Sequence, residues 1–92
     1  MMESEKRRAI RAFVLSCTRK CSAGFVNKKE LWSAFYLRFG DTAKVSRKDF
    51  FSLIDEVIYE QYEVPYRHDI QYNNSVVRGY RGIQVRNTLK EE

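Results

Sequence analysis

The sequence predicts a small α+β domain, mainly helical with a small antiparallel sheet. Three stretches before Pro65 carry apolar residues at three- and four-residue spacing, which is typical of amphipathic helices. After Pro65 the spacing changes to alternation, which is typical of strands. The 92 residues suffice for one modest hydrophobic core. We therefore expect a single domain over residues 1–92, with its core at about residues 6–87.

The first predicted helix begins near Ser4, a residue type suited to the N-cap. Gly24 ends its pattern, and Phe25-Val26 is long enough only for a short edge strand. The buried stripe of this helix is expected to contain Ala9 or Ile10, followed by Phe13, Val14, Cys17 and Cys21.

The second predicted helix has the clearest start. Asn27 is an N-cap, and Glu30, three residues later, completes a capping box. Val26 and Leu31 stand at the positions of a hydrophobic staple, and Gly40 is a natural stop.

The third predicted helix repeats this arrangement. Ser46 is the expected N-cap, and Asp49 occupies the position of the capping-box acid. Val45 and Phe50 form a second staple. The helix should end before Pro65, because the residue preceding a proline resists helical geometry.

The end of the chain predicts a β-hairpin. Residues 68–72 alternate as a strand, Asn73-Asn74 suits a tight turn, and residues 77–85 return as the partner strand. Gly79 and Gly82 inside the second strand indicate a bulge or a close backbone approach. Three helices, a short strand and a closing hairpin, called a wing, together make a winged helix-turn-helix.

The charge is positive overall and unevenly distributed. The formal net charge is +5. Residues 1–40 carry nine Lys and Arg against three Asp and Glu, residues 41–66 three against six, and residues 67–92 five against three. A basic chain favours anionic partners. A cationic face would have to be built from the two ends of the chain.

Several function classes find no support in the residues. No apolar run approaches the ~20 residues of a membrane span, and the first residues are charged, so we expect a soluble, intracellular protein without a membrane partner. No glycine-rich phosphate loop is present, and His68 is the one histidine. Cys17 and Cys21 would supply half of a zinc site, which needs about four ligands, and fit better as small apolar side chains. We expect no enzyme activity, no cofactor and no metal.

The start of the third helix is one candidate DNA-binding surface. In winged helices this element enters the major groove with its N-terminal residues nearest the bases. The alternative is a solvated first turn. Carboxylates at Asp55, Glu56 and Glu60 would repel phosphates and oppose a deep lengthwise insertion. The candidate residues here are Lys44, Ser46, Arg47 and Lys48.

The wing is the second candidate surface. Arg78 and Arg81 are suited to guanine edges or to a narrow minor groove, and Tyr80 to a sugar or a phosphate. The alternative is that these arginines pair with the acidic middle segment. Phosphate contacts that position the domain are expected from Lys28, Lys29, Arg7, Arg8 and Arg11.

Three segments resemble known winged-helix families. Val76 to Arg86, Asn27-Lys-Lys-Glu-Leu-Trp-Ser-Ala-Phe-Tyr36 and Val45-Ser-Arg-Lys-Asp-Phe50 are similar to the C-terminal domain of viral and phage-plasmid primase-helicases of the poxvirus type. The wing strand also resembles that of the RFX DNA-binding domain. The resemblance implies a winged-helix fold, nucleic-acid binding, a viral or mobile-element origin and hence the nucleus or cytoplasm of a host cell. From RFX it implies major-groove reading by Arg78 and Arg81. The primase and ATPase domains of the first family are absent from this chain.

These observations favour a protein that binds double-stranded DNA in transcription regulation or DNA replication, with a replication or transcription protein as a further partner. One rival hypothesis is a protein-interaction module that docks through the acidic third helix and through Tyr59, Tyr62 and Tyr66. Another is a single-strand or RNA binder that stacks bases on Tyr80 and Trp32. The residues leave the oligomeric state and the target sequence open.

Overall fold

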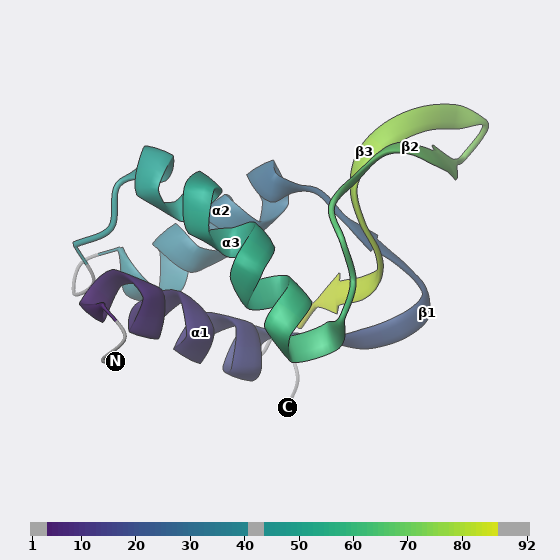
Figure 1. The fold of residues 1–92 in the computed structure, drawn as a ribbon. Coiled ribbons are helices and arrows are strands. Elements are labelled where there is room, and N and C mark those ends of the chain that lie inside the picture. Colours follow the sequence, from purple (N-terminus) through teal and green to yellow (C-terminus); the bar gives the residue numbers. More distant parts are fainter. Residues whose placement is uncertain (1–3, 41–43, 87–92) are drawn as a thin grey trace.

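The computed structural model describes residues 4–40 and 44–86, and it has the predicted α+β class. Within these residues, a helix and a strand are followed by two helices and a hairpin, a winged-helix-like layout (Figure 1). Residue 87, the last of the expected core, lies outside the described residues. The elements are α1 (Glu5–Cys17), β1 (Thr18–Val26), α2 (Lys28–Phe39), α3 (Arg47–Tyr62), β2 (Arg67–Tyr72) and β3 (Ser75–Val85).

The three predicted helix starts are confirmed. The Ser4 hydroxyl accepts a hydrogen bond from the backbone N–H of Arg7 at 3.1 Å. Asn27 and Glu30 form both bonds of the capping box, at 2.8 and 3.0 Å. The Ser46 hydroxyl accepts from the backbone N–H of Asp49 at 3.1 Å. These bonds satisfy backbone donors that the first turn of a helix leaves without a partner.

The end of α1 differs from the prediction. The helix stops at Cys17, and the chain continues as a nine-residue strand in place of the expected two-residue strand. Cys21 therefore lies on β1 and not on the buried stripe of the helix. Pairing of β1 with β3 supplies the backbone hydrogen bonds that further helical turns would have made.

The sheet is antiparallel, and β3 is its central strand, in the order β1-β3-β2. Asn73 and Asn74 have φ values of 52° and 65°, the conformation of a tight hairpin turn. His68 and Asp69 of β2 stand opposite the single residue Arg78 of β3, which makes a bulge. The predicted hairpin is thus confirmed, with its irregularity at the middle of the wing.

Gly79 permits a close approach of two strands, as predicted. Its backbone lies so near Val26 that an added Cβ would overlap the Val26 carbonyl oxygen and approach the ring of Phe25. Its φ is 154°. The approach brings the root of the wing against the point where β1 leads into α2.

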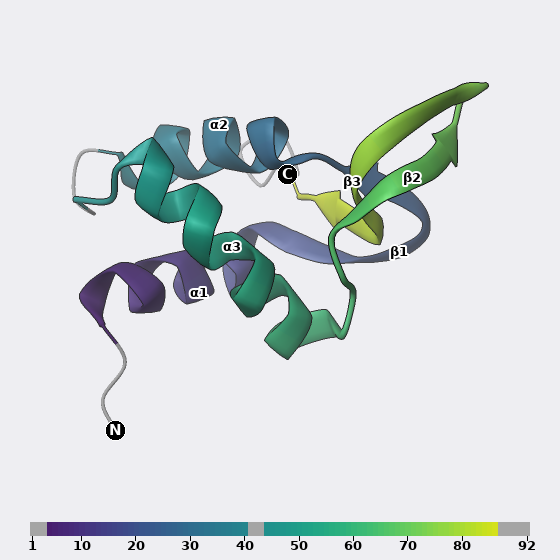
Figure 2. The same ribbon diagram turned by 45° about the horizontal axis from the view of Figure 1, so that its top comes forward.

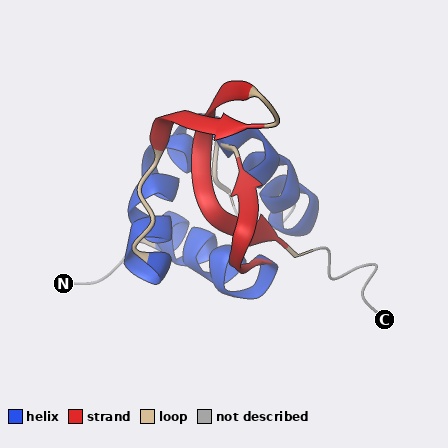
Figure 3. Cartoon of the chain, turned by 90° about the vertical axis from the view of Figure 1, so that its right-hand side faces the viewer, coloured by secondary structure: helices blue, strands red, loops and turns tan. Residues whose placement is uncertain are grey.

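The core lies between the helices and the sheet. Phe50 is central to it, with ring centroids 4.9 Å from Phe35, 5.4 Å from Trp32 and 6.2 Å from Phe13. Figures 2 and 3 show the helices packed together and the sheet covering one end, with the wing extending beyond them. Within residues 4–40 and 44–86, no helix has the length and apolar character needed to cross a membrane.

Candidate nucleic-acid interface

The first turn of α3 is exposed and cationic. Lys44, Arg47 and Lys48 are all exposed, and the guanidinium carbon of Arg47 lies 5.2 Å from the centroid of the Phe51 ring. Ser46 serves as the N-cap, so its hydroxyl is already engaged by the helix. All four predicted residues are thus exposed, and the Ser46 hydroxyl also has a structural role as the N-cap.

Lys28 differs from the prediction because its ammonium group points into the domain. Nζ lies 3.3 Å from a carboxylate oxygen of Asp55 and donates to the carbonyl oxygen of Phe51 at 3.4 Å. It also sits 4.5 Å from the centroid of the Tyr66 ring, a cation–π contact. These partners occupy Lys28, whereas its neighbour Lys29 is exposed.

Tyr80 also differs from the prediction, because its side chain is fully buried. Its hydroxyl donates a hydrogen bond to the carboxylate of Asp55, and its ring lies 5.4 Å from that of Tyr66. Burial, together with the Asp55 carboxylate, raises the pKa of Tyr80 far above its ordinary value. The pairing of Tyr80 with the buried Val26 turns the tyrosine inward. Tyr80 is thus an anchor of the wing and not a group that could touch DNA.

The two wing arginines have different surroundings. Arg78 is exposed, opposite the bulge of β2. Arg81 is exposed as well, but it lines a hollow with Glu63 and Asp69, beside the loop that precedes β2. Asp69 itself is ion-paired with Arg67 at 3.2 Å. Arg78 lies on the hairpin side of Gly79, and Arg81 pairs in register with Phe25, shortly before α2 begins.

Two of the three arginines of α1, Arg7 and Arg11, bind the acidic side of α3, whereas Arg8 is exposed. The Arg7 guanidinium lies 2.6 Å from Glu56 and also contacts Glu60, and Arg11 lies 3.3 Å from Glu60. Burial lowers the pKa of Arg7 and its two carboxylate partners raise it, with a net rise. The prediction that these two arginines contact phosphates is corrected, because the packing of α1 against α3 places them beside carboxylates.

A hollow between α3 and β2 has both aromatic and acidic walls. Tyr59 in its wall is 55% exposed, and the rings of Tyr66 and His68 meet edge to face at 5.0 Å. Negative charge at this place opposes contact with phosphates along the second half of α3. The lining residues are Asp55, Glu56, Tyr59, Glu60, Pro65, Tyr66 and His68.

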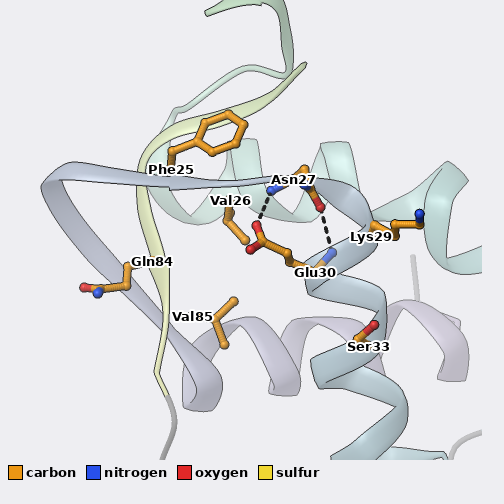
Figure 4. A pocket seen from close by; sticks show the side chains of 8 residues that line it. All are labelled: Phe25, Val26, Asn27, Lys29, Glu30, Ser33, Gln84 and Val85. Carbon is orange, nitrogen blue, oxygen red and sulfur yellow. Dashed lines mark hydrogen bonds between the residues drawn. The ribbon is translucent and has the colours of Figure 1, made fainter. Parts of the chain in front are cut away.

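A second hollow lies between α2 and the ends of β1 and β3 (Figure 4). The side chains of Asn27 and Glu30 in its wall are occupied by the capping box. The other polar side chains that line it are Lys29, Ser33 and Gln84.

Two further expectations concern metals and base stacking. In residues 4–40 and 44–86, no three His, Cys, Asp or Glu side chains come together in a way that could hold a metal ion. Trp32 is half-buried and packs against Phe35 and Phe50, with centroids at 6.0 and 5.4 Å. With Tyr80 buried too, the two aromatic residues considered for base stacking belong to the interior.

Asp55 contacts both Tyr80 and Lys28, although the sequence predicts only an exposed carboxylate at this position. Its i, i+4 spacing from Phe51 and Tyr59 gave no indication that one carboxylate would meet both Lys28 and Tyr80. Those contacts depend on how β3 crosses α3, which local spacing does not encode.

No protein-family model, curated protein or solved structure matches this chain. The similarity to primase-helicase and RFX winged-helix domains therefore stays a prediction.

Proposed function

We propose that this chain is a winged-helix protein that binds double-stranded DNA through the first turn of α3, the first turn of α2 and the wing. Its role would be in transcription regulation or DNA replication. The observation that carries the proposal is the sorting of charge by the fold. Ion pairs within the domain engage the carboxylates of α3, whereas a set of exposed cations has no carboxylate partner among the described residues.

The engaged carboxylates are distributed along α3. Asp49 lies 2.7 Å from Lys6, Asp55 lies 3.3 Å from Lys28, and Glu56 lies 2.6 Å from Arg7. Each pair reduces the negative charge that a phosphate backbone would meet. The repulsion expected from an acidic α3 is thereby weakened, and it is concentrated in the second half of the helix.

The exposed cations are connected through contacts between their elements. Lys28 and Arg47 both lie over the Phe51 ring, at 5.9 and 5.2 Å, so the start of α2 adjoins the first turns of α3. Gly79 abuts Val26, the residue before the N-cap of α2, and Arg78 is its exposed neighbour on the wing. The proposed DNA-binding residues are Lys29, Lys44, Arg47, Lys48 and Arg78.

This arrangement suits a shallow docking. The first turn of α3 would approach the major groove, with Arg47 and Lys48 nearest the bases. Arg78 would touch the neighbouring backbone or groove, and Lys29 and Lys44 would contact phosphates. The acidic second half of α3 would stay away from the duplex.

Salt dependence of affinity tests the proposal. If the five proposed cations together neutralise five phosphate charges, the slope of log affinity against log salt is roughly −4.5. A fluorescein-labelled random duplex is titrated at several salt concentrations, and binding is followed by fluorescence anisotropy. Binding that does not respond to salt, or no binding at low salt, would remove the proposal.

The aromatic and acidic hollow favours one rival function, a protein-interaction module. Tyr59 is a large exposed ring beside carboxylates, a surface better suited to a basic polypeptide than to a nucleic acid. Tyr59→Glu separates the two functions, because it should leave duplex affinity nearly unchanged while disrupting a protein partner's contact. A large loss of duplex affinity in this variant would mean that DNA contacts the second half of α3, which contradicts the proposal.

A further inference from the structure

We infer that Asp55 is a positioning residue that fixes the wing relative to α3, so that Arg78 and the first turn of α3 face one duplex together. The inference rests on the proposed function and deepens it. Asp55 would then favour DNA binding by orienting the wing, whereas its charge alone would repel phosphates.

One carboxylate joins three elements. Asp55 lies on α3; one of its oxygens accepts the hydroxyl hydrogen of Tyr80 on β3, and the other lies 3.3 Å from Nζ of Lys28 on α2. Lys28 continues the contact to the Tyr66 ring at 4.5 Å, just before β2 begins. Helices α2 and α3 and strand β3 therefore meet at this side chain, and Lys28 extends the contact to the residue before β2.

Tyr80 is placed where it can control the wing. Along β3 from the hairpin turn, Ser75, Val76 and Arg78 are exposed, and Tyr80 is the first side chain that is fully buried. Beyond it the hairpin extends away from the helices (Figures 1 and 2). A rotation of the strand at Tyr80 would carry Arg78, two residues away, across the surface.

The polar nature of the contact makes the placement specific. A buried hydroxyl without a partner is costly, so Tyr80 keeps its ring where the hydroxyl reaches Asp55. The high pKa of Tyr80 keeps this hydroxyl protonated and able to donate. An apolar ring in the same space would pack without this directional requirement.

The direction in which Asp55→Asn changes duplex affinity shows whether Asp55 acts by positioning the wing or only through its charge. Asp55→Asn removes a negative charge, so simple electrostatics predicts tighter binding of DNA. If Asp55 positions the wing, the variant binds more weakly, because an amide accepts less strongly from Tyr80 and cannot pair with Lys28 as a carboxylate does. The matched control is Glu63→Gln, which removes a carboxylate from the exposed end of the same helix.

The experiment measures duplex affinity by anisotropy at one low salt concentration for wild type and three variants. We expect Asp55→Asn and Tyr80→Phe to weaken binding by about threefold or more, and Glu63→Gln to bind as well as wild type or better. Asp55→Asn binding as tightly as Glu63→Gln would overturn the inference. Tyr80→Phe retains the ring and covers the case in which Asp55→Asn does not fold.

A second readout requires no DNA. Residual dipolar couplings of backbone amides report the orientation of residues 67–78 relative to the three helices. We expect both Asp55→Asn and Tyr80→Phe to change these couplings in the wing while those of the helices keep one common orientation, and Glu63→Gln to change neither. Unchanged wing couplings would overturn the inference. Wild-type protein that binds no duplex would remove the proposed function alone, since the couplings still decide the role of Asp55.

Discussion

The guanidinium of Arg7 on α1 lies 2.6 Å from the carboxylate of Glu56 on α3, and the Arg7 side chain is only 16% exposed. The basic start of the chain and its acidic middle therefore meet within the fold. This contact determines which cations remain for a polyanion, because it directs positive charge of α1 to the acidic side of α3.

Replacing Arg7 by Met should destabilise the domain. The substitution keeps much of the aliphatic contact but leaves Glu56 and Glu60 without their closest partner. We expect a loss of about 1.5 kcal/mol in the free energy of unfolding, between the values for exposed and buried pairs. Urea denaturation followed by circular dichroism measures it.

The control for this substitution is Arg8→Met, because Arg8 is the next residue of α1 and is exposed. It removes the same charge and should change stability by less than about 0.5 kcal/mol. Equal effects of the two substitutions would show that the Arg7 contacts contribute little.

Reversing the charge of the first turn of α3 should abolish duplex binding. In Arg47→Glu with Lys48→Glu, both proposed groove residues become repulsive to phosphates, and we expect affinity at low salt to fall by about a hundredfold or more. Anisotropy titration of the labelled duplex measures the change.

A matched pair is available on β1. Arg19→Glu with Lys20→Glu changes the net charge equally, and Thr18 beside them contacts Tyr62 at the opposite end of α3 from Arg47. This pair should lose far less affinity. Similar losses in both pairs would mean that net charge alone governs binding.

Alkaline pH should destabilise the domain through Tyr80. Burial and the Asp55 carboxylate hold the pKa of Tyr80 above its ordinary value of about 10, and Lys28 and Tyr66 are the other titratable groups around it. Below pH 10 both folded and unfolded chains keep this proton, so its contribution is fully present. Above pH 10 the unfolded chain loses the proton first, and the free energy of unfolding falls by up to about 1.4 kcal/mol per pH unit.

Comparison of wild type with Tyr80→Phe isolates this contribution, since other groups titrate in both proteins. The stability advantage of wild type, measured by urea denaturation, should shrink as the pH rises from 9 to 11. The exposed Tyr59→Phe should show no such change. If the difference in the free energy of unfolding between wild type and Tyr80→Phe stays constant over this pH range, the Tyr80 hydroxyl is not buried as described.

Gly79→Ala should be more destabilising than Gly82→Ala. An added Cβ at Gly79 overlaps the Val26 carbonyl oxygen, whereas at Gly82 no atom lies within 4 Å. Gly82 has a φ of 92°, so alanine there costs about 1–2 kcal/mol from backbone strain alone. We expect a larger loss at Gly79, measured by thermal denaturation, and the reverse order would contradict the close approach of β3 and β1.

The sequence was most informative where local chemistry decides the structure. Ser4, Asn27 and Ser46 each cap a helix through a bond to a residue three positions later, and Asn73-Asn74 form the hairpin turn. These features depend on neighbours in the chain, so spacing alone predicts them.

Features that depend on distant partners were not predicted. The extent of β1 depends on its pairing with β3, about sixty residues later, and the spacing of Cys17 and Cys21 suggested a longer helix. The sequence predicts an outward-facing Tyr80, because alternation along a strand does not tell which of its two faces meets α3. The pairing of Arg7 with Glu56 likewise required the packing of two helices.

An NMR titration of the labelled protein with a random-sequence duplex tests the central claim most directly. We expect salt-sensitive shifts in the backbone amides of Lys29, Lys44, Arg47, Lys48 and Arg78, with little change around Tyr59 and Glu60. Shifts centred on Tyr59, Tyr66 and His68, or no shifts at all, would contradict DNA binding through the first turn of α3 and the wing.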